Sequence, residues 1–544
     1  MTVAVLVTLL ACAAPQQAPS ESTEQVRQAP AAQPAKRGGT FHIPLNFNAP
    51  NLNPYILSGT GKNVTNPVYE FLMVRGTAPG KNWYEDQKFI PWLAEKWEQP
   101  DPNTYVFILR RGVIWHDGRP FTSADIVHTI GFLKENRGKV NASSLAANIA
   151  RVEAPDDYTV RLVLANPNPD FFFDLVSMEI TAKHVAEAGK QLETNATGTG
   201  PYVMKEFDQA TGYKVARNPN YWVKDQPYLD GITGHYLADR GTVIAGFAAD
   251  NLDMINVEDK VLFDSVQQLK PGLVYERFYG KTGYAMFFAL DQLPYSDIRV
   301  RRAINLTADR QDMLVKGAFG EGFINPPGVY GWKKGYAIPP EELVKLPGYS
   351  PATKQQDIVE AKRLLAEAGY PTGFTGKISY LGGGASYKVV AEVLGTQLQA
   401  VGINATLVPL DSATDAQVSR DESFEMYILG ASGRDSRSEW FERFHSKGTF
   451  NKRGPKDPEL DAILEKYQVE PDVAAAQKLA QQFQRRLYDQ AYLIGAFERA
   501  SYSIYQPWVH DMLNNYGASP VPYWWPATAW MDIEAMPVSR RTER

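Results

Sequence analysis

Apolar and polar residues alternate along several short stretches of the chain, with the period of two that is typical of strands. The clearest predicted strand covers residues 105–109, and another covers residues 158–164 after the turn sequence Pro155-Asp156-Asp157. A first short strand is predicted at residues 40–43, directly after Gly38-Gly39. The folded part of the chain is therefore expected to begin at residue 38.

Other stretches place apolar residues three and four positions apart, as on the buried face of a helix. Thr122 is expected to cap such a helix, with Asp125 in its first turn, as in a capping-box variant. A second helix is expected to end at Gly369, because glycine readily adopts the left-handed conformation that closes helices. The apolar positions of the two helices are Ile126, Val127, Ile130 and Leu133, and Ile358, Ala361, Leu364, Leu365 and Ala368.

A strand, a helix and a second strand are predicted in succession at residues 377–380, 389–398 and 403–410. This order is typical of a βαβ unit. A further amphipathic helix is predicted over residues 473–487. The mixture of elements predicts α/β lobes. Because a single hydrophobic core stops growing near ~250 to 300 residues, a chain of 544 residues should form two or more of them.

The only cysteine of the chain, Cys12, follows an apolar run that begins at Val3. Residues 3–10 are too few to span a bilayer, which needs about 20 apolar residues, but they match the apolar core of a secretory signal. The sequence Leu-Leu-Ala-Cys at residues 9–12 resembles a bacterial lipobox. That resemblance implies cleavage before Cys12, a lipid on its sulfur and a mature protein anchored to the membrane outside the cytoplasm. Residues 13–37, rich in Ala, Pro, Gln and Ser, are expected to form a disordered tether.

Composition disfavours several kinds of partner and chemistry. A net charge of -5 over 544 residues does not suit binding by phosphate neutralisation, so no nucleic-acid partner is expected. A single cysteine excludes an internal disulfide. The seven histidines lack metal-ligand spacing, and the chain has no Gly-x-Ser-x-Gly motif. Neither a metal, a cofactor nor an enzymatic activity is therefore expected.

One long motif, at residues 105–125, is specific. Its sequence is Tyr-Val-Phe-Ile-Leu-Arg-Arg-Gly-Val-Ile-Trp-His-Asp-Gly-Arg-Pro-Phe-Thr-Ser-Ala-Asp. The motif resembles the signature of the extracellular solute-binding proteins of family 5, the peptide, dipeptide and nickel binding components of ABC importers. Shorter segments that support the resemblance, in the order typical of the family, are residues 91–97, 198–202, 217–222, 297–303 and 361–370.

Within these segments the residues are expected to build structure rather than chemistry. Gly112 and Gly118 permit backbone turns that a Cβ would obstruct. Asp117 is expected to accept hydrogen bonds from turn amides. Trp222 is expected to anchor a core.

The resemblance implies a bilobal periplasmic-binding-protein fold of the α/β class, type II and cluster C, with an extra domain inserted in the first lobe. Chain crossings near residues 280 and 500 would form a hinge, and closure on a ligand would be signalled to the permease of an ABC importer. A monomer is expected, since such a receptor has to present two moving lobes. The implied division is residues 38–79, 190–280 and 501–544 for lobe I, 80–189 for the inserted domain II, and 281–500 for lobe III.

For peptide binders of this family, an aspartate in lobe III pairs with the α-amino group of the ligand. The stretch 424–435 resembles that region and implies this role for Asp435. It departs from the family at Gly430-Ala431, where Gly-Trp is usual, and the acid stands one position later. Further candidates for binding the ligand are Trp332, Arg434, Trp440, Tyr516, Trp524 and Trp525.

Several functions stay open on this basis. The first hypothesis is a lipid-anchored, extracytoplasmic receptor that binds short peptides and feeds an ABC importer. The altered stretch before Asp435 and the tryptophans favour an oligosaccharide receptor as the alternative. A nickel-chelate binder, an extracytoplasmic hydrolase and a surface adhesion or signalling receptor are weaker hypotheses.

Overall fold

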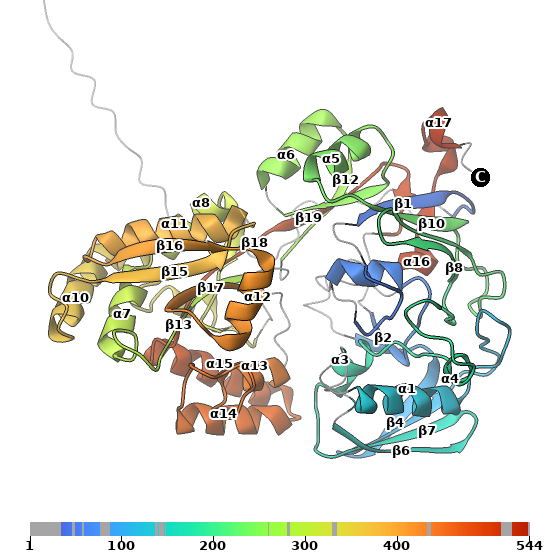
Figure 1. Cartoon of the computed structure of the whole chain (residues 1–544), viewed down its shortest axis with the longest axis horizontal. Coiled ribbons are helices and arrows are strands. Elements are labelled where there is room, and N and C mark those ends of the chain that lie inside the picture. Colours follow the sequence, from blue (N-terminus) through green and yellow to red (C-terminus); the bar gives the residue numbers. More distant parts are fainter. Residues whose placement is uncertain are drawn as a thin grey trace, which may run out of the picture.

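The structure, a computed structural model, has two halves that lie side by side (Figure 1). We call the half built on a six-stranded sheet the six-stranded lobe, and the other half, which contains two four-stranded sheets and a three-stranded sheet, the first lobe. The structure describes residues 34–45, 49–56, 59–76, 88–136, 140, 146, 148–258, 260–279, 283–328, 335–383, 385–431, 437–512 and 525–541.

The four-stranded sheet nearest the N-terminus has the strand order β1-β10-β9-β8. β1 pairs in parallel with β10, with Thr40 opposite Gly231. Phe41 and Ile43 are buried in the core while His42 between them is partly exposed, so β1 confirms the predicted strand at residues 40–43. The strands are β1 (Thr40–Leu45), β8 (Tyr202–Asp208), β9 (Gly212–Arg217) and β10 (Gly231–Tyr236).

A three-stranded antiparallel sheet with the order β11-β19-β12 lies beside it. Helices α5 (Arg240–Ala248) and α6 (Lys260–Leu269) cover one face of this sheet (Figure 1). On that face the ring of Phe263 stacks on Tyr502 with the centroids 4.1 Å apart. The strands are β11 (Met254–Val257), β12 (Val274–Phe278) and β19 (Ser501–Tyr505).

The second four-stranded sheet of the first lobe, β4-β5-β7-β6, is antiparallel, and with its helices we call it the β4–β7 subdomain. The amide of Thr122 donates to Asp125 Oδ2 at 2.9 Å, which confirms the predicted capping box. Gly112 and Gly118 have φ of 79° and 89°, which confirms the predicted turns. The elements are β4 (Ala94–Asp101), β5 (Thr104–Leu109), β6 (Ile149–Asp156), β7 (Thr159–Leu164), α1 (Ser123–Glu135), α3 (Phe171–Leu175) and α4 (Lys183–Glu187).

Two further expectations, one for the motif and one for the segment 217–222, are met in and beside this subdomain. The amide of Arg119 donates to Asp117 Oδ1 at 3.4 Å, as expected for a turn aspartate. Trp222 packs against the hydrophobic core of the subdomain, and its indole N–H donates to Glu70 Oε2 at 2.9 Å. Burial raises the pKa of Glu70, and hydrogen bonds from Trp222 and Tyr221 oppose this effect.

The six-stranded sheet has the order β14-β18-β13-β17-β15-β16. β15 and β16 are parallel, with Thr375 opposite Asn404, and a helix connects them, which confirms the predicted βαβ unit. The strands are β13 (Gly283–Phe288), β14 (Gly322–Ile324), β15 (Thr375–Leu381), β16 (Asn404–Leu410), β17 (Met426–Ala431) and β18 (Leu493–Arg499).

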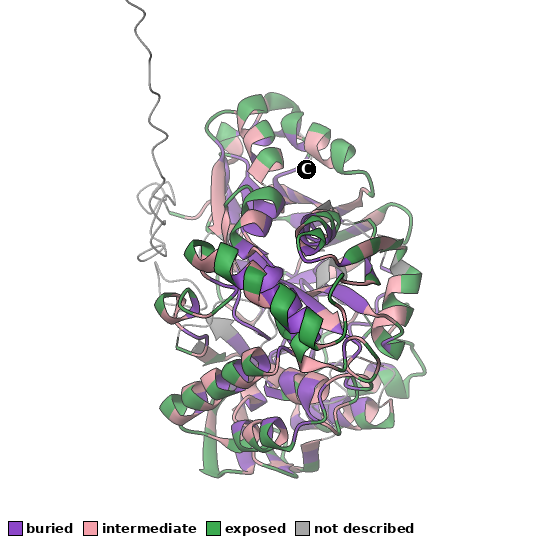
Figure 2. Ribbon diagram, turned by 90° about the vertical axis from the view of Figure 1, so that its left-hand side faces the viewer, coloured by how far each residue is buried: buried purple, intermediate pink, exposed green. Residues whose placement is uncertain are grey.

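Helices cover both faces of this sheet (Figure 1). One group packs on one face through a core that includes Val300, Met313, Leu365 and Leu394, and consists of α7 (Ile298–Thr307), α8 (Arg310–Ala318), α10 (Lys354–Glu367) and α11 (Ala385–Gln399). The other group shares a separate core with Ala285 and Leu493 and consists of α13 (Arg437–Phe444), α14 (Pro458–Val469) and α15 (Val473–Asp489). Figure 2 shows buried residues on the inner sides of these helices and exposed residues on the outer sides.

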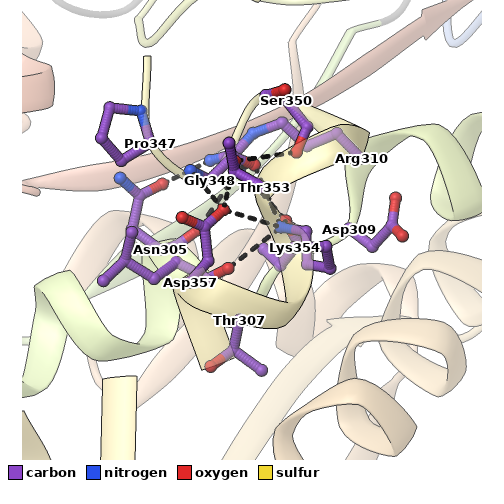
Figure 3. Close-up of polar contacts among 12 residues, drawn as sticks. Asn305, Thr307, Asp309, Arg310, Pro347, Gly348, Ser350, Thr353, Lys354 and Asp357 are labelled. Carbon is purple, nitrogen blue, oxygen red and sulfur yellow. Dashed lines mark hydrogen bonds and ion pairs between the residues drawn. The ribbon is translucent and has the colours of Figure 1, made fainter. Parts of the chain in front are cut away.

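A buried polar cluster joins α7, α8 and the start of α10 (Figure 3). Arg310 is 1% exposed and donates to the main-chain oxygens of Gly348 at 2.7 Å and Gly495 at 2.8 Å. The amide of Gly348 donates to Asp357 Oδ2 at 3.0 Å. Burial lowers the pKa of Lys354, which contacts the same loop, to about 8. The guanidinium thus pairs with buried carbonyl groups of β18 and of the loop before α10.

Short elements complete the described parts of the chain. They are β2 (Met73–Gly76), β3 (Lys88–Pro91), β20 (Val509–His510), β21 (Trp530–Met531), α9 (Pro340–Leu343), α12 (Ser412–Asp421), α16 (Trp525–Thr528), α17 (Val538–Arg541), η1 (Gly59–Val64), η2 (Pro351–Thr353) and η3 (Ile533–Ala535). None of the described helices combines the length and the apolar character that a membrane crossing needs.

Candidate functional site

Two stretches of described chain approach the boundary between the lobes and continue on its other side. β12 ends at Phe278 in the first lobe, and β13 begins at Gly283 in the six-stranded lobe. β18 and β19 are separated by Ala500 alone, so they form one nearly continuous path through both lobes. The amide of Ala500 donates to the main-chain oxygen of Glu321 at 2.9 Å. Such paired connections are typical of a hinge, because a few residues at the ends of elements can absorb the rotation of whole lobes.

Two ion pairs join the lobes beside these connections. Arg499 Nη2 lies 2.6 Å from Glu258 Oε2, and Arg499 Nη1 donates to Ser386 Oγ on α11 at 2.6 Å. Arg277 on β12 lies 3.0 Å from Glu321 Oε2, just before β14. These contacts hold the lobes at their present angle, and the rings of Tyr279 and Phe323, with centroids 5.4 Å apart, pack beside them.

The face of the three-stranded sheet opposite α5 and α6 carries a polar row of Asn256, Ser503 and Glu276, which lie opposite one another in register. Ser503 Oγ donates to Asn256 Oδ1 at 2.7 Å. Glu276 Oε2 is buried and has no hydrogen-bond partner among the described residues. Burial raises the pKa of Glu276 well above its usual range. A carboxylate in this state gains from a cationic group placed beside it.

The lobes also touch at a point far from the hinge strands, between α3 of the β4–β7 subdomain and α13 of the six-stranded lobe (Figure 1). The amide of Arg437 donates to Asp170 Oδ2 at 3.0 Å, and Arg437 Nε lies 3.4 Å from Asp170 Oδ1. The two side chains are 8% and 16% exposed. A boundary with connections at one end and a contact at the other can enclose a ligand between the lobes.

Most of the residues predicted to bind a ligand lie outside the described residues, and so does the predicted lipid attachment site. Trp525 is the first residue of α16. Trp440 is 3% exposed and stacks between Tyr467 and Phe483, with ring centroids 5.2 Å and 4.5 Å away. Its indole therefore packs inside the core of the six-stranded lobe. The predicted residues outside the described parts are Cys12, Trp332, Arg434, Asp435, Tyr516 and Trp524.

Sequence analysis did not identify the residues that join the lobes. Arg437 and Asp170 are 267 positions apart, and Arg499 and Glu258 are 241 positions apart. Neither the local periodicity of apolar residues nor a sequence motif predicts a contact between residues so far apart in the sequence. The available signal was the position of Arg499 next to the expected chain crossing near residue 500, where the lobes have to meet.

Comparison with known proteins agrees with this architecture. The profile of the family described as "Bacterial extracellular solute-binding proteins, family 5 Middle" matches residues 88–451. Among curated proteins, the glutathione-binding protein GsiB of Salmonella choleraesuis is 26% identical over 479 residues, which cover 85% of this chain and 88% of that protein.

Solved structures of similar fold include the ABC transporter substrate binding protein CtaP from Listeria monocytogenes. It matches with a TM-score of 0.77 and 19% identity, over 91% of this chain and 100% of that chain. The oligopeptide-binding protein AppA from Bacillus subtilis, in complex with a nonapeptide, matches with a TM-score of 0.72 and 18% identity, over 92% of this chain and 100% of that chain. These similarities confirm the predicted bilobal α/β fold.

Proposed function

Because the chain belongs to the bacterial extracellular solute-binding proteins of family 5, we propose that it captures short peptides between its lobes and delivers them to the permease of an ABC importer. The members of this family are extracytoplasmic substrate-binding receptors and not enzymes. The proposal for peptides is supported by the similarity to a glutathione-binding protein and to an oligopeptide-binding protein.

The observation that carries the proposal is the pair of chain connections at residues 278–283 and 499–501, with the contact of α3 and α13 at the other end of the boundary. A ligand that touches both lobes stabilises the closed arrangement. It shifts the population only by its difference in affinity for the closed and open forms. The closed form therefore indicates that a ligand is bound, and the permease needs to distinguish only the closed form from the open form.

We propose that Asp435 pairs with the α-amino group of the peptide. Arg434, Trp332, Tyr516, Trp524 and Trp525 are proposed to contact the rest of the ligand. A peptide would bind mainly through its backbone, as in strand addition, so selectivity for side chains would be loose. The packing of Trp440 in the core suits a role in stability instead.

The experiment is a thermal-shift screen of the protein without its first 37 residues, followed by calorimetry. A pool of short peptides should raise the melting temperature by mass action, and Asp435→Asn should abolish most of that rise. Asp421→Asn serves as the control, because Asp421 is a half-exposed aspartate of the same lobe that pairs with Lys452 at 3.4 Å. An equal shift for the Asp435→Asn variant would contradict the role of Asp435. Stabilisation by cello-, xylo- or manno-oligosaccharides and not by peptides would instead support an oligosaccharide receptor.

We further propose that Cys12 carries a lipid anchor, and that residues 13–37 tether the folded body to the membrane. The lobes are proposed to comprise residues 38–79, 190–280 and 501–544 for lobe I, 80–189 for domain II and 281–500 for lobe III. The gaps between β12 and β13 and between β18 and β19 support the boundaries at 280 and 500. Mass spectrometry of the membrane fraction should find the lipid on wild-type protein and not on Cys12→Ser.

A further inference from the structure

The contact between Asp170 and Arg437 has the geometry of a helix cap supplied by the opposite lobe. Arg437 is the first residue of α13, and its amide donates to Asp170 Oδ2 at 3.0 Å. Asp170 precedes α3 but makes no side-chain cap hydrogen bond to that helix. Its carboxylate serves the N-terminus of α13 instead, where the helix dipole favours a negative charge.

Both partners are held in place by their own lobes. The Arg437 guanidinium donates to the main-chain oxygens of Tyr467, at 2.6 Å, and Glu470, and lies over the Tyr467 ring. The amide of Asp170 donates to Asn168 Oδ1 at 3.0 Å. The Arg437 guanidinium therefore loses little side-chain entropy when the contact forms, and the low exposure of both groups reduces the screening that weakens surface ion pairs.

Tyr336 completes the surroundings of this contact on the six-stranded lobe. Burial raises the pKa of Tyr336, the positive charge of Arg437 opposes this effect, and the negative charge of Asp170 adds to it. The carboxylate therefore meets a cation and a main-chain N–H, both from the opposite lobe. This set of partners is available to Asp170 only when the lobes are together.

We infer that Asp170 is a positioning residue for ligand capture, which holds the N-terminus of α13 against the β4–β7 subdomain and so stabilises the closed arrangement. The inference rests on the proposed function, because α13 begins two positions after Asp435 in the sequence. The apparent affinity for a ligand falls with the fraction of protein in the binding-competent arrangement. Loss of the contact should therefore weaken peptide binding.

The test compares Asp170→Ala and Asp170→Asn with wild type in two measurements. Calorimetry with a short peptide should show affinity about tenfold weaker for Asp170→Ala, with a smaller loss for Asp170→Asn, which keeps one acceptor. Hydrogen exchange of the ligand-free protein should be faster by about tenfold or more at the amides of residues 437–444 in Asp170→Ala. In an Arg437→Pro background, which lacks both donors and suits the first helical position, Asp170→Ala should have no further effect.

Glu187→Ala is the matched control, since Glu187 forms an exposed pair with Lys183 at 3.4 Å in the same subdomain. It should change neither measurement. Unchanged exchange at residues 437–444, or unchanged peptide affinity, in Asp170→Ala would overturn the inference while leaving the proposed function intact. A wild-type protein that binds no peptide would overturn the proposed function, and the exchange comparison would still decide the role of Asp170. If Asp170→Ala does not fold, the same criteria apply to Asp170→Asn.

Discussion

Arg499 Nη2 lies 2.6 Å from Glu258 Oε2, and the pair joins the end of a strand of the six-stranded lobe to the segment that follows β11 in the first lobe. The Arg499 side chain is 11% exposed, whereas that of Glu258 is 39% exposed. The pair therefore links the two lobes directly. Solvent reaches the Glu258 carboxylate, whereas the Arg499 guanidinium is held in place by Ser386 on α11. A change of angle at the hinge has to stretch or break it.

Replacing Glu258 with glutamine should loosen the hinge. The guanidinium of Arg499 would stay largely buried with a weaker partner, at a cost of about 1 kcal/mol in the free energy of unfolding. Urea unfolding should show this loss, and small-angle X-ray scattering of the ligand-free protein should show a larger mean radius of gyration. Glu392→Gln should leave both measurements unchanged, because Glu392 forms an exposed pair with Lys388. Identical unfolding and scattering of the Glu258→Gln and wild-type proteins would show that the pair does not restrain the hinge.

Local sequence signals predicted those elements that are stabilised by contacts between residues close together in the sequence. The capping box of Thr122 and Asp125 and the βαβ unit of β15, α11 and β16 occur where the sequence predicted them. In each case the determining contacts join residues a few positions apart or follow from a period of buried positions. The long motif at residues 105–125 indicated the family, and the family in turn implied the bilobal fold.

The contacts between lobes were not predictable in the same way. Asp170 stands in a polar stretch and Arg437 in a charged one, and nothing local distinguishes them from solvated residues. Their pairing depends on the arrangement of two lobes that each have their own core. Trp440 shows the converse difficulty: a polar sequence context suggested a cleft, but the helix it belongs to turns the indole inward against Tyr467 and Phe483.

Glu276→Gln should stabilise the ligand-free protein in a pH-dependent manner. Burial raises the pKa of Glu276, so its contribution to stability is complete below the unfolded pKa near ~4.3 and is lost as the pH rises towards the folded pKa. Glutamine has the same size and no charge. At pH 7.5 the variant should be more stable than wild type by about 1 kcal/mol, and the difference should shrink at pH 4.5. Thermal melts at both pH values check this; a destabilised variant at pH 7.5 would mean that the carboxylate has a cationic partner.

Arg310→Lys should destabilise the six-stranded lobe. Lysine keeps the charge but cannot reach the carbonyl oxygens of Gly348 and Gly495 together, as the planar guanidinium does. Because the site is buried, the expected loss is about 3 kcal/mol in the free energy of unfolding. Arg363→Lys is the control, since Arg363 pairs with Glu360 on an exposed helix face and should cost less than about 0.5 kcal/mol. Urea unfolding of the two variants should separate them clearly, and equal losses would contradict a structural role for the cluster.

Trp440→Leu should reduce stability and leave ligand affinity unchanged. The indole contributes stacking on two rings and fills space in the core that α13 shares with α14 and α15, so its removal should cost about 2 to 4 kcal/mol. Its N–H has no hydrogen-bond partner among the described residues, so leucine breaks no polar contact there. The measurement is urea unfolding together with calorimetry of peptide binding at a temperature where the variant is folded. Trp525→Ala tests the opposite case, because the contact proposed between Trp525 and the ligand predicts a loss of affinity with little change in unfolding. Loss of peptide affinity without loss of stability in Trp440→Leu would assign that indole to the ligand site.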